Sequence, residues 1–407
     1  MDILHCDLNN FYASVEQVMN PELSGKFIAV SGNPATRSGI ILAKNTAAKQ
    51  CGVKTGEAIW QARQKCPDLI CVPPHFDAYV HYSKRVRQIY EQYTDKVEGF
   101  GLDECWLDVT HSKIFGTPYE IAELLRREVR EKTGLTISVG VSFTKTFAKL
   151  GSDMKKPDAT TVITPDNFRE VVWPLDVSEM LYVGPRVKKK LNSIGIFTLG
   201  DLANASTPAL TRIFGVVGER MKNCALGNDC DPVAGSAAEK EVKSVSHGTT
   251  TLRDMVTYHD AEVVISVLSE MVATRLRRYG YVGSVVYLDV RRNDLTHESK
   301  QQSVHPTLVS KDIYETAARL LKAIWKGTAD TPLRSLTVGV GNLAPVSVGV
   351  QMSLFDDKDD KQQKLEFYVD QIRNKYGFGV ITKASTLNND LVSKGMAAED
   401  DLLPFKR

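Results

Sequence analysis

Two short stretches of the sequence decide the fold: Cys6-Asp7-Leu8-Asn9-Asn10-Phe11-Tyr12 and Gly101-Leu102-Asp103-Glu104-Cys105-Trp106-Leu107-Asp108. Each places acidic side chains at the end of an apolar run that is typical of a β-strand. The first run covers Ile3 to Leu8. The second covers Val97 to Leu102 and resumes from Cys105 to Val109, which predicts two strands joined by a tight acidic turn. If these strands are neighbours, Asp7, Asp103 and Glu104 meet at one edge of a sheet.

Three carboxylates in one place stay ionised only if cations neutralise them. Hard divalent ions such as Mg²⁺ favour such oxygen sites, which water and substrate phosphates complete. A solvated turn is the commoner meaning of an Asp-Glu dipeptide taken alone. The order of the surrounding elements therefore has to decide between the two interpretations.

That order favours the metal site. A helix starts at Phe11 to Gln17, and longer helices are expected from Ala78, with Asp77 as N-cap, to about Gln92 and from Pro118 to Thr133. A strand follows at Ile137–Val141. Strand, helix, two strands, helix, strand is the ferredoxin-like order, which puts the first strand beside the acidic hairpin.

Composition sets broad limits on the protein. A chain of 407 residues predicts two to four domains, and 43% hydrophobic with 25% charged residues is ordinary for a soluble globular protein. The formal charge of +2 is too small to argue for nucleic acid, so local patches must carry that case. Seven cysteines without a CxxC pair predict reduced thiols. No signal sequence or membrane span is found, so we expect a cytoplasmic protein.

A small basic block lies between the two acidic stretches. Strands are expected at Phe27–Ser31 and Ile40–Ala43, followed by a helix that ends at Cys66-Pro67. Its cations are Arg37, Lys44, Lys49, Lys54, Arg63 and Lys65. Such a run is often only a solvated face, but beside a metal site it suits a phosphate-bearing substrate.

A new unit starts near Asp166. Tyr182 to Leu191, followed by Ile194-Gly195-Ile196, predicts two short helices around a glycine turn. This is the helix-hairpin-helix pattern, which holds DNA phosphates without reading sequence. The candidate contacts are Gly184, Arg186, Lys188, Lys189 and Gly195. A solvated lysine face is the alternative.

A linker rich in alanine, glycine and charge precedes a separate α/β domain. Strands are expected at Lys243–Thr251, Gly283–Arg291 and Leu333–Asn342, and helices at Asp260–Arg278 and Asp312–Lys326. Arg291 and Arg292 give this domain a basic side that suits a nucleic-acid backbone. Beyond Pro345, Gln351-Met352-Ser353-Leu354-Phe355 is an apolar cluster that fits docking into a partner's groove, and a last helix is expected from Gln362 to Tyr376.

From about Met1 to Phe355 the chain resembles the Y-family translesion DNA polymerases, bacterial polymerase IV (DinB) and its UmuC-like members. Five motifs in the same order carry this resemblance. They are Asp7 with Phe11-Tyr12-Ala13-Ser14-Val15-Glu16, Leu102-Asp103-Glu104 with Leu107-Asp108, Phe147-Ala148-Lys149 through Lys156-Pro157, the helix-hairpin-helix, and Gln351 to Phe355.

The resemblance implies an α+β right-hand polymerase that extends a primer 3′-OH with dNTPs, with low fidelity and across damaged templates. Its parts would be a ferredoxin-like palm (1–18 and 75–165), fingers (19–74), a thumb (166–230), a linker (231–242), an α/β little finger (243–345), a clamp-binding peptide (346–360) and a C-terminal helix and tail (361–407). The implied partners are primer-template DNA, a dNTP and a bacterial sliding clamp, with the protein itself monomeric.

The resemblance also implies roles for single residues. Asp7 and Asp103 would bind two Mg²⁺ ions, for which Mn²⁺ can substitute, and Glu104 would help to hold the ion that activates the primer, with Leu8 completing the metal set. The triphosphate would contact Leu8, Asn9, Asn10, Phe11, Tyr12, Thr46, Lys49 and Lys156. Tyr12 would also exclude the 2′-OH of ribonucleotides. Gln351, Leu354 and Phe355 would contact the clamp.

Some positions depart from the polymerase IV pattern. Thr46 and Lys49 stand where those relatives usually carry Tyr and Arg, and Asn9 stands where they carry a second acid. These departures are UmuC-like, whereas the clamp peptide and single-chain layout are typical of polymerase IV. Two other functions remain open: a nucleotidyl cyclase, which shares the palm but not the helix-hairpin-helix or clamp peptide, and a non-catalytic DNA-binding scaffold, which would not need Asp7, Asp103, Glu104 and Tyr12.

Overall fold

The computed structural model describes residues 1–33, 37, 39–229, 231–235, 242–346, 357–386 and 389–391, and for 357–360 and 378 it describes the backbone alone. The chain divides into two compact units. The first comprises Met1–Pro34 and Gly39–Glu239, and the second Ala35–Ser38 and Lys240–Arg407.

The first unit is built on a five-stranded sheet in the order β5-β6-β1-β7-β8. Its strands are β1 (Ile3–Leu8), β5 (Val97–Phe100), β6 (Glu104–Asp108), β7 (Ile137–Ser142) and β8 (Thr160–Ile163). Strand β1 lies between β6 and β7 and is antiparallel to both. The ferredoxin-like order predicted from the sequence is therefore confirmed, with β8 added parallel to β7 at the edge.

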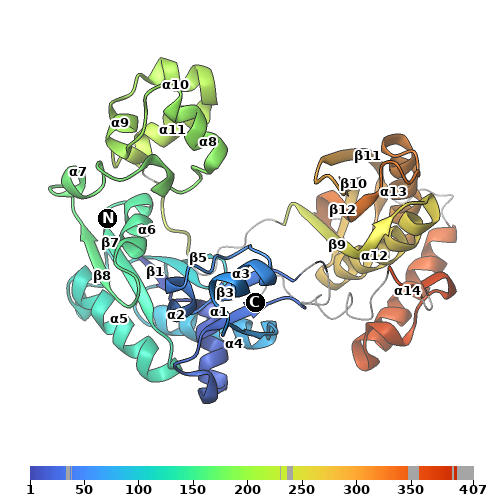
Figure 1. Cartoon of the computed structure of the whole chain (residues 1–407), viewed down its shortest axis with the longest axis horizontal. Coiled ribbons are helices and arrows are strands. Elements are labelled where there is room, and N and C mark those ends of the chain that lie inside the picture. Colours follow the sequence, from blue (N-terminus) through green and yellow to red (C-terminus); the bar gives the residue numbers. More distant parts are fainter. Residues whose placement is uncertain are drawn as a thin grey trace. The chain divides into compact units, whose positions relative to one another are not determined.

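Helices cover both faces of this sheet (Figure 1). The apolar side chains Leu4, Cys6 and Leu8 of β1 share one core with residues of α1 (Phe11–Met19), α4 (Phe76–Tyr90) and α5 (Pro118–Thr133). On the opposite face, Ile3 packs with Ala148 of α6 (Lys145–Met154). Period-two alternation along β1 thus sends alternate side chains to the two helical layers.

The predicted start of α4 was wrong by two residues. The helix begins at Phe76, and its N-cap is His75 rather than Asp77. His75 is held in place because its Nδ1 lies 2.9 Å from the carboxylate of Glu16 on α1. Asp77 instead lies in the first turn, where its negative charge stabilises the helix dipole.

The basic block forms a separate three-stranded sheet with the order β3-β2-β4. Its elements are β2 (Ile28–Ser31), β3 (Ile41–Lys44), α2 (Thr46–Gln50), α3 (Ile59–Lys65) and β4 (Ile70–Val72). The short strand β4 was not predicted. It pairs parallel with β2, which closes a small core of its own around Ile41 and Val53.

Short helices form the last part of the first unit: α7 (Phe168–Val171), α8 (Pro185–Asn192), α9 (Leu199–Asn204), α10 (Thr207–Phe214) and α11 (Val216–Ala225). The turn between α8 and α9 contains Gly195, whose φ of +81° is in the left-handed region that favours glycine. The two short helices around a glycine turn are therefore present as predicted.

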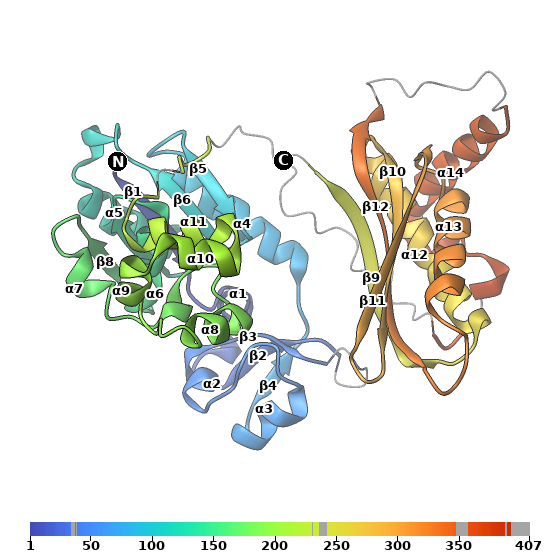
Figure 2. The ribbon, with the colours of Figure 1, turned by 90° about the horizontal axis from the view of Figure 1, so that it is seen from above.

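The second unit is a four-stranded antiparallel sheet in the order β11-β10-β12-β9, with helices on one side (Figure 2). Its elements are β9 (Ser244–Met255), α12 (Tyr258–Tyr279), β10 (Tyr281–Arg292), β11 (His297–Thr307), α13 (Ser310–Ile324), β12 (Leu333–Pro345) and α14 (Asp357–Tyr376). Strand β11 was missed because it is polar along nearly its whole length and lies exposed at the sheet edge.

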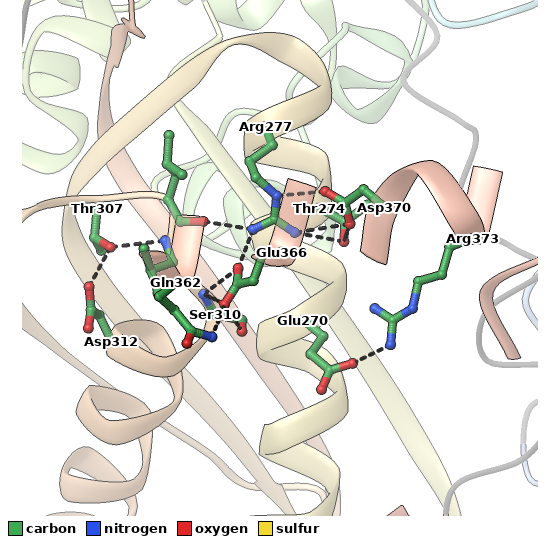
Figure 3. Close-up of polar contacts among 12 residues, drawn as sticks. Glu270, Thr274, Arg277, Thr307, Ser310, Asp312, Gln362, Glu366, Asp370 and Arg373 are labelled. Atoms are coloured by element: carbon green, nitrogen blue, oxygen red, sulfur yellow. Dashed lines mark hydrogen bonds and ion pairs between the residues drawn. The ribbon is translucent and has the colours of Figure 1, made fainter. Parts of the chain in front are cut away.

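Helix α14 is held by ion pairs to α12 and by hydrogen bonds from Ser310 at the start of α13 (Figure 3). The predicted clamp-binding residues Gln351, Leu354 and Phe355 precede it and lie outside the described residues. Within the ranges given above, none of the helices combines the length and the apolar character needed to cross a membrane.

Candidate active site

The two acidic stretches meet as predicted at the level of the backbone. Asp7 of β1 is directly opposite Glu104 of β6 in the antiparallel register. Asp103 precedes β6, and its carbonyl accepts a hydrogen bond from the amide of Leu8 at 3.0 Å. The fold therefore gathers the three acidic residues at one place on the sheet.

Two lysines lie among these carboxylates. Lys149 of α6 places its Nζ 3.2 Å from Asp7 Oδ2 and 3.0 Å from Glu104 Oε1. Lys156, just beyond α6, places its Nζ 2.6 Å from Asp7 Oδ2. Both ammonium groups also pair with Asp153. Helix α6 thus supplies the positive charge that the acidic strands require.

Burial and the neighbouring cations act in opposite directions on the pKa values of the site. Burial raises the pKa of Asp7 to about 6, and Glu104 acts in the same direction while Lys156 and Lys149 oppose it. Burial also raises the pKa of Asp103, again with help from Glu104. For Glu104 burial acts upward, but His5 and Lys149 together lower the pKa. Negative charge is therefore unfavourable here unless cations stay close.

The carboxylate oxygens of the acidic residues are of the kind that binds divalent cations, but the side chains are not arranged around a common point. Within the described ranges, no three His, Cys, Asp or Glu side chains are gathered closely enough to hold a metal ion. Lys149 instead lies between Asp7 and Glu104. Its ammonium contacts carboxylate oxygens of the type that Mg²⁺ binds, so the donor set fits a hard cation.

Tyr12 stands at the first turn of α1, next to the acidic cluster. Its ring stacks on Tyr79 with centroids 4.2 Å apart and planes 10° from parallel. Tyr79 is fixed in turn because its hydroxyl donates to the buried carboxylate of Glu16. Burial raises the pKa of Tyr12, and so does the charge of Asp103. The half-buried Tyr12 ring therefore has a fixed orientation close to Asp103.

The predicted triphosphate cradle is only partly free to bind a ligand. The amides of Leu8 and Asn9 donate to Asp103 and Thr136 within the protein. The side chain of Asn9 is also used internally, since it bonds Ser138, Thr136 and the amide of Asp158. Donors for a phosphate must therefore come from the start of α1, after Asn9.

Asn10 connects the sheet to the basic block. Its Nδ2 donates to Thr46 Oγ1 of α2 at 3.0 Å. Lys49 is exposed on the same short helix. The structure therefore brings Asn10 and Thr46 together, whereas Lys156 contacts Asp7.

The sequence did not predict two contacts of this site, those of Lys149 and His5. Lys149 was identified only as part of the motif from Phe147 to Pro157, and its pairing with Asp7 was not expected. His5 is fully buried, with Nε2 3.3 Å from Glu104 Oε2. The only signal was the alternation of β1, which puts His5 and Asp7 on one face.

The predicted DNA contacts are in several environments. Arg186 and Lys189 are exposed on α8, whereas Lys188 forms an ion pair with Asp176 at 2.8 Å. In the second unit, Arg292 pairs with Glu298 at 2.6 Å. Lys188 and Arg292 would therefore have to exchange a carboxylate for a phosphate.

A ferredoxin-like sheet with an acidic pair on two adjacent strands, lysines beside that pair and a stacked aromatic ring fits the palm of a nucleotide-polymerising enzyme. The comparisons with known proteins specify its kind. Residues 6–153 match the impB/mucB/samB family, and residues 242–365 match the C-terminal domain of that family. DNA polymerase IV of Acetivibrio thermocellus is 44% identical over 95% of this chain and 98% of its own length.

Other relatives agree. DNA polymerase IV of Moorella thermoacetica is 37% identical over 95% of this chain and 96% of its own length. Among solved structures, a Y-family DNA polymerase chimera has a TM-score of 0.75 at 26% identity, covering 85% of this chain and all of its own. DinB from Sulfolobus solfataricus has a TM-score of 0.56 at 26% identity, covering 84% of this chain and 98% of its own.

The chain belongs to the Y family of DNA polymerases, in its DinB-type branch. The relatives named DNA polymerase IV decide between the two branches that the sequence left open. It functions as a translesion DNA polymerase. Polymerases of this family depend on divalent metal ions. The fold class, with palm, fingers, thumb and a separate little finger, is confirmed by the same structural neighbours.

Proposed function

We propose that this chain extends a primer on a DNA template with dNTPs, using Asp7, Asp103 and Glu104 as ligands of two Mg²⁺ ions. The observation that carries the proposal is the register of Asp7 opposite Glu104, with lysine ammonium groups bonded to their oxygens. Divalent ions held by these carboxylates would supply positive charge that stabilises the attacking and leaving oxygens of phosphoryl transfer. A site whose side-chain ligands are all carboxylates favours Mg²⁺, and Mn²⁺ can replace it.

The remaining residues bind and orient the nucleotide. The first amides of α1, from Asn10 on, point donors at an anionic group, because the start of a helix has unpaired N–H groups. Lys156 neutralises phosphate charge, and Lys49 with Thr46 completes the contact from α2. Lys is a point charge rather than a bidentate fork, so these contacts hold the triphosphate without fixing its rotation.

We assign Tyr12 to sugar discrimination. Its ring cannot move aside, because it stacks on Tyr79, which Glu16 fixes. A ring held under the sugar leaves no space for a 2′-OH. Tyr12→Ala should therefore admit ribonucleotides while dNTP incorporation continues, as measured by single-nucleotide kinetics with each nucleotide. Unchanged discrimination in that variant would contradict the assignment.

DNA would be held outside the active site by phosphate contacts. The exposed Arg186 and Lys189 with Gly184 and Gly195 suit a backbone contact by the thumb. Arg291 and Arg292 would add contacts from the little finger. The pattern Gln351 to Phe355 suits docking to a bacterial sliding clamp, and Leu354→Ala/Phe355→Ala should abolish clamp-stimulated extension but not basal extension.

Primer extension tests the central proposal. Wild-type protein with Mg²⁺ should extend a primer on an undamaged template and on one with an abasic site. Asp103→Ala/Glu104→Ala should abolish both activities while primer-template binding is kept. Glu131→Ala, which removes an exposed carboxylate on α5, is the matched control and should extend normally. Extension by the double variant at the wild-type rate would refute the carboxylate assignment.

A further inference from the structure

A buried histidine lies directly behind the acidic pair. His5 precedes Asp7 by two residues on β1, has no solvent-exposed surface and points toward α6. Buried histidines are often satisfied core residues. Here, however, the ring faces the carboxylate of Glu104, which we assign to metal binding, so His5 is a candidate for a functional role.

Three contacts fix the orientation of the His5 ring. Its Nδ1 lies 2.8 Å from Ser152 Oγ on α6, and its Nε2 lies 3.3 Å from Glu104 Oε2. The ring packs edge to face on Trp106, with centroids 5.1 Å apart. Trp106 is fixed because its indole N–H donates to the carbonyl of Lys145 at 3.0 Å. The ring of His5 therefore cannot turn away from Glu104.

The pattern of donors shows which nitrogen carries the proton. Burial keeps His5 neutral at physiological pH by lowering its pKa to about 4. A proton on Nδ1 would leave the lone pair of Nε2 facing the Glu104 carboxylate, which is repulsive. With the proton on Nε2, Nε2–H points at Glu104, and Nδ1 can accept from the Ser152 hydroxyl if that hydroxyl turns from the carbonyl of Lys149, 2.8 Å away. Only this tautomer of the neutral ring directs a donor at the Glu104 carboxylate.

The two oxygens of Glu104 face different partners. Oε1 lies 3.0 Å from Lys149 Nζ, on the side of Asp7, and Oε2 faces His5. In the present geometry neither Nε2 of His5 nor Oε2 of Glu104 has a well-aligned hydrogen-bond partner within the described residues. A small rotation of the carboxylate would pair them. After that rotation His5 would hold Oε2 and leave Oε1 directed at the site.

Close packing makes this contact possible. Gly140 of β7 lies against Gly151 of α6, since a side-chain carbon built on Gly151 would lie 3.1 Å from Gly140 Cα. A side-chain carbon built on Gly140 would lie 1.9 Å from the carbonyl oxygen of Ala148. This approach brings α6 near enough for Ser152 to reach a residue in the middle of the sheet. A histidine on β1 can therefore connect α6 to β6.

We propose that His5 is a positioning residue that holds the Glu104 carboxylate in the rotation needed for metal binding. The proposal rests on the proposed role of Glu104 as a metal ligand. Hydrogen-bond partners behind metal ligands typically change metal affinity or activity by about 10- to 100-fold when they are removed. We therefore expect an effect of that size at His5.

The test compares His5→Phe, which removes both nitrogens, with His5→Gln, whose amide can still donate to Glu104. Ser152→Ala removes the partner of Nδ1 and should give an intermediate effect. Mn²⁺ binding is measured by electron paramagnetic resonance on the complex with dNTP and a primer-template that lacks the 3′-OH. The Mg²⁺ concentration for half-maximal single-nucleotide incorporation is measured in parallel.

His5→Phe should weaken Mn²⁺ binding and raise the half-saturating Mg²⁺ concentration by about 10- to 100-fold. His5→Gln should remain within about threefold of wild type, and primer-template affinity should not change in any variant. A purely structural role would lower the unfolding temperature of His5→Phe without moving the metal titration. Equal titrations for wild type, His5→Phe and Ser152→Ala would overturn the proposal.

Glu104→Ala separates this proposal from the one on which it rests. If Glu104→Ala keeps wild-type Mn²⁺ binding and activity, the metal-ligand role of Glu104 fails. If Glu104→Ala loses both while His5→Phe keeps both, only the positioning role of His5 fails.

Discussion

We expect that removing one side chain, Arg277, loosens helix α14 from the rest of the second unit. Arg277 of α12 is only 11% exposed and binds two acidic residues of α14, Glu366 and Asp370 (Figure 3). It holds Asp370 through two bonds, Nε to Oδ2 at 2.6 Å and Nη2 to Oδ1 at 3.0 Å. It also donates to the carbonyl of Leu308 at 3.0 Å. Arg277→Ala would therefore leave two nearly buried carboxylates without their cation.

The size of the effect follows from what each carboxylate keeps. Removing one partner of a buried ion pair costs about 3–5 kcal/mol. Glu366 keeps the amide and hydroxyl of Ser310, and Asp370 keeps the hydroxyl of Thr274 at 2.8 Å. These donors place the cost near the lower limit, about 3 kcal/mol. Since about 1.4 kcal/mol is a factor of ten, α14 should open about 100-fold more often.

Hydrogen exchange of the α14 amides in the full chain measures this opening. Arg277→Ala should speed exchange there by about 100-fold, with little change in the first unit. Lys322→Ala is the control, because it removes an exposed cation 3.7 Å from Glu262, and such pairs contribute less than about 1 kcal/mol.

A second variant separates charge from packing. Arg277→Met/Glu366→Gln/Asp370→Asn removes the cation together with both negative charges, and it should recover most of the protection. Exchange in Arg277→Ala that differs from wild type by less than about threefold would refute the reasoning. It would mean that other contacts of α14, such as Arg373 with Glu270 at 2.8 Å, hold the helix.

Two further predictions follow from packing and charge. Gly140→Ala forces a carbon against the Ala148 carbonyl, so thermal unfolding should occur at lower temperature and primer extension should fall as α6 moves. Burial opposes ionisation of Asp260, but Arg253 and the amides of Val256 and Thr257 hold its pKa below the ordinary value. Because the pKa of Asp260 is lower in the folded state, its ionised form stabilises the fold at pH values above the unfolded-state pKa of about 3.9. This stabilisation is lost as the pH falls through the folded-state pKa. The stability difference between wild type and Asp260→Asn in urea should therefore shrink below about pH 4 and stay constant at neutral pH.

Much of the fold could be predicted because its pattern is local. Helix α5 begins and ends where Pro118 and the following Gly134 predict, since its Thr117–Glu120 capping box and the left-handed glycine are encoded within a few residues. Strand β11 could not be found this way. An exposed edge strand has no buried face, so its sequence shows neither alternation nor an apolar run.

In the candidate site, too, the local features could be predicted and the contacts between distant elements could not. Asp7, Asp103 and Glu104 were predicted because each ends an apolar run, and topology then brings the runs together. The contacts of Lys149 and His5 depend on the distance between α6 and the sheet, which is set by Gly140 and Gly151. The distance between α6 and the sheet cannot be predicted from the spacing of residues in the sequence. The internal bonds of Asn9 were missed for the same reason, because they join β1 to the segment after α6.

These observations connect packing to chemistry in one element. Adjacent β1 and β6 place carboxylates opposite each other, an arrangement that burial makes unfavourable. Helix α6 offsets that cost with Lys149, while Ser152 orients His5 behind Glu104. The two lysines are also the groups that would have to yield if divalent ions took their place between the oxygens. The close approach of α6 to β7 at Gly140 and Gly151 is what brings Ser152 within reach of His5 on β1.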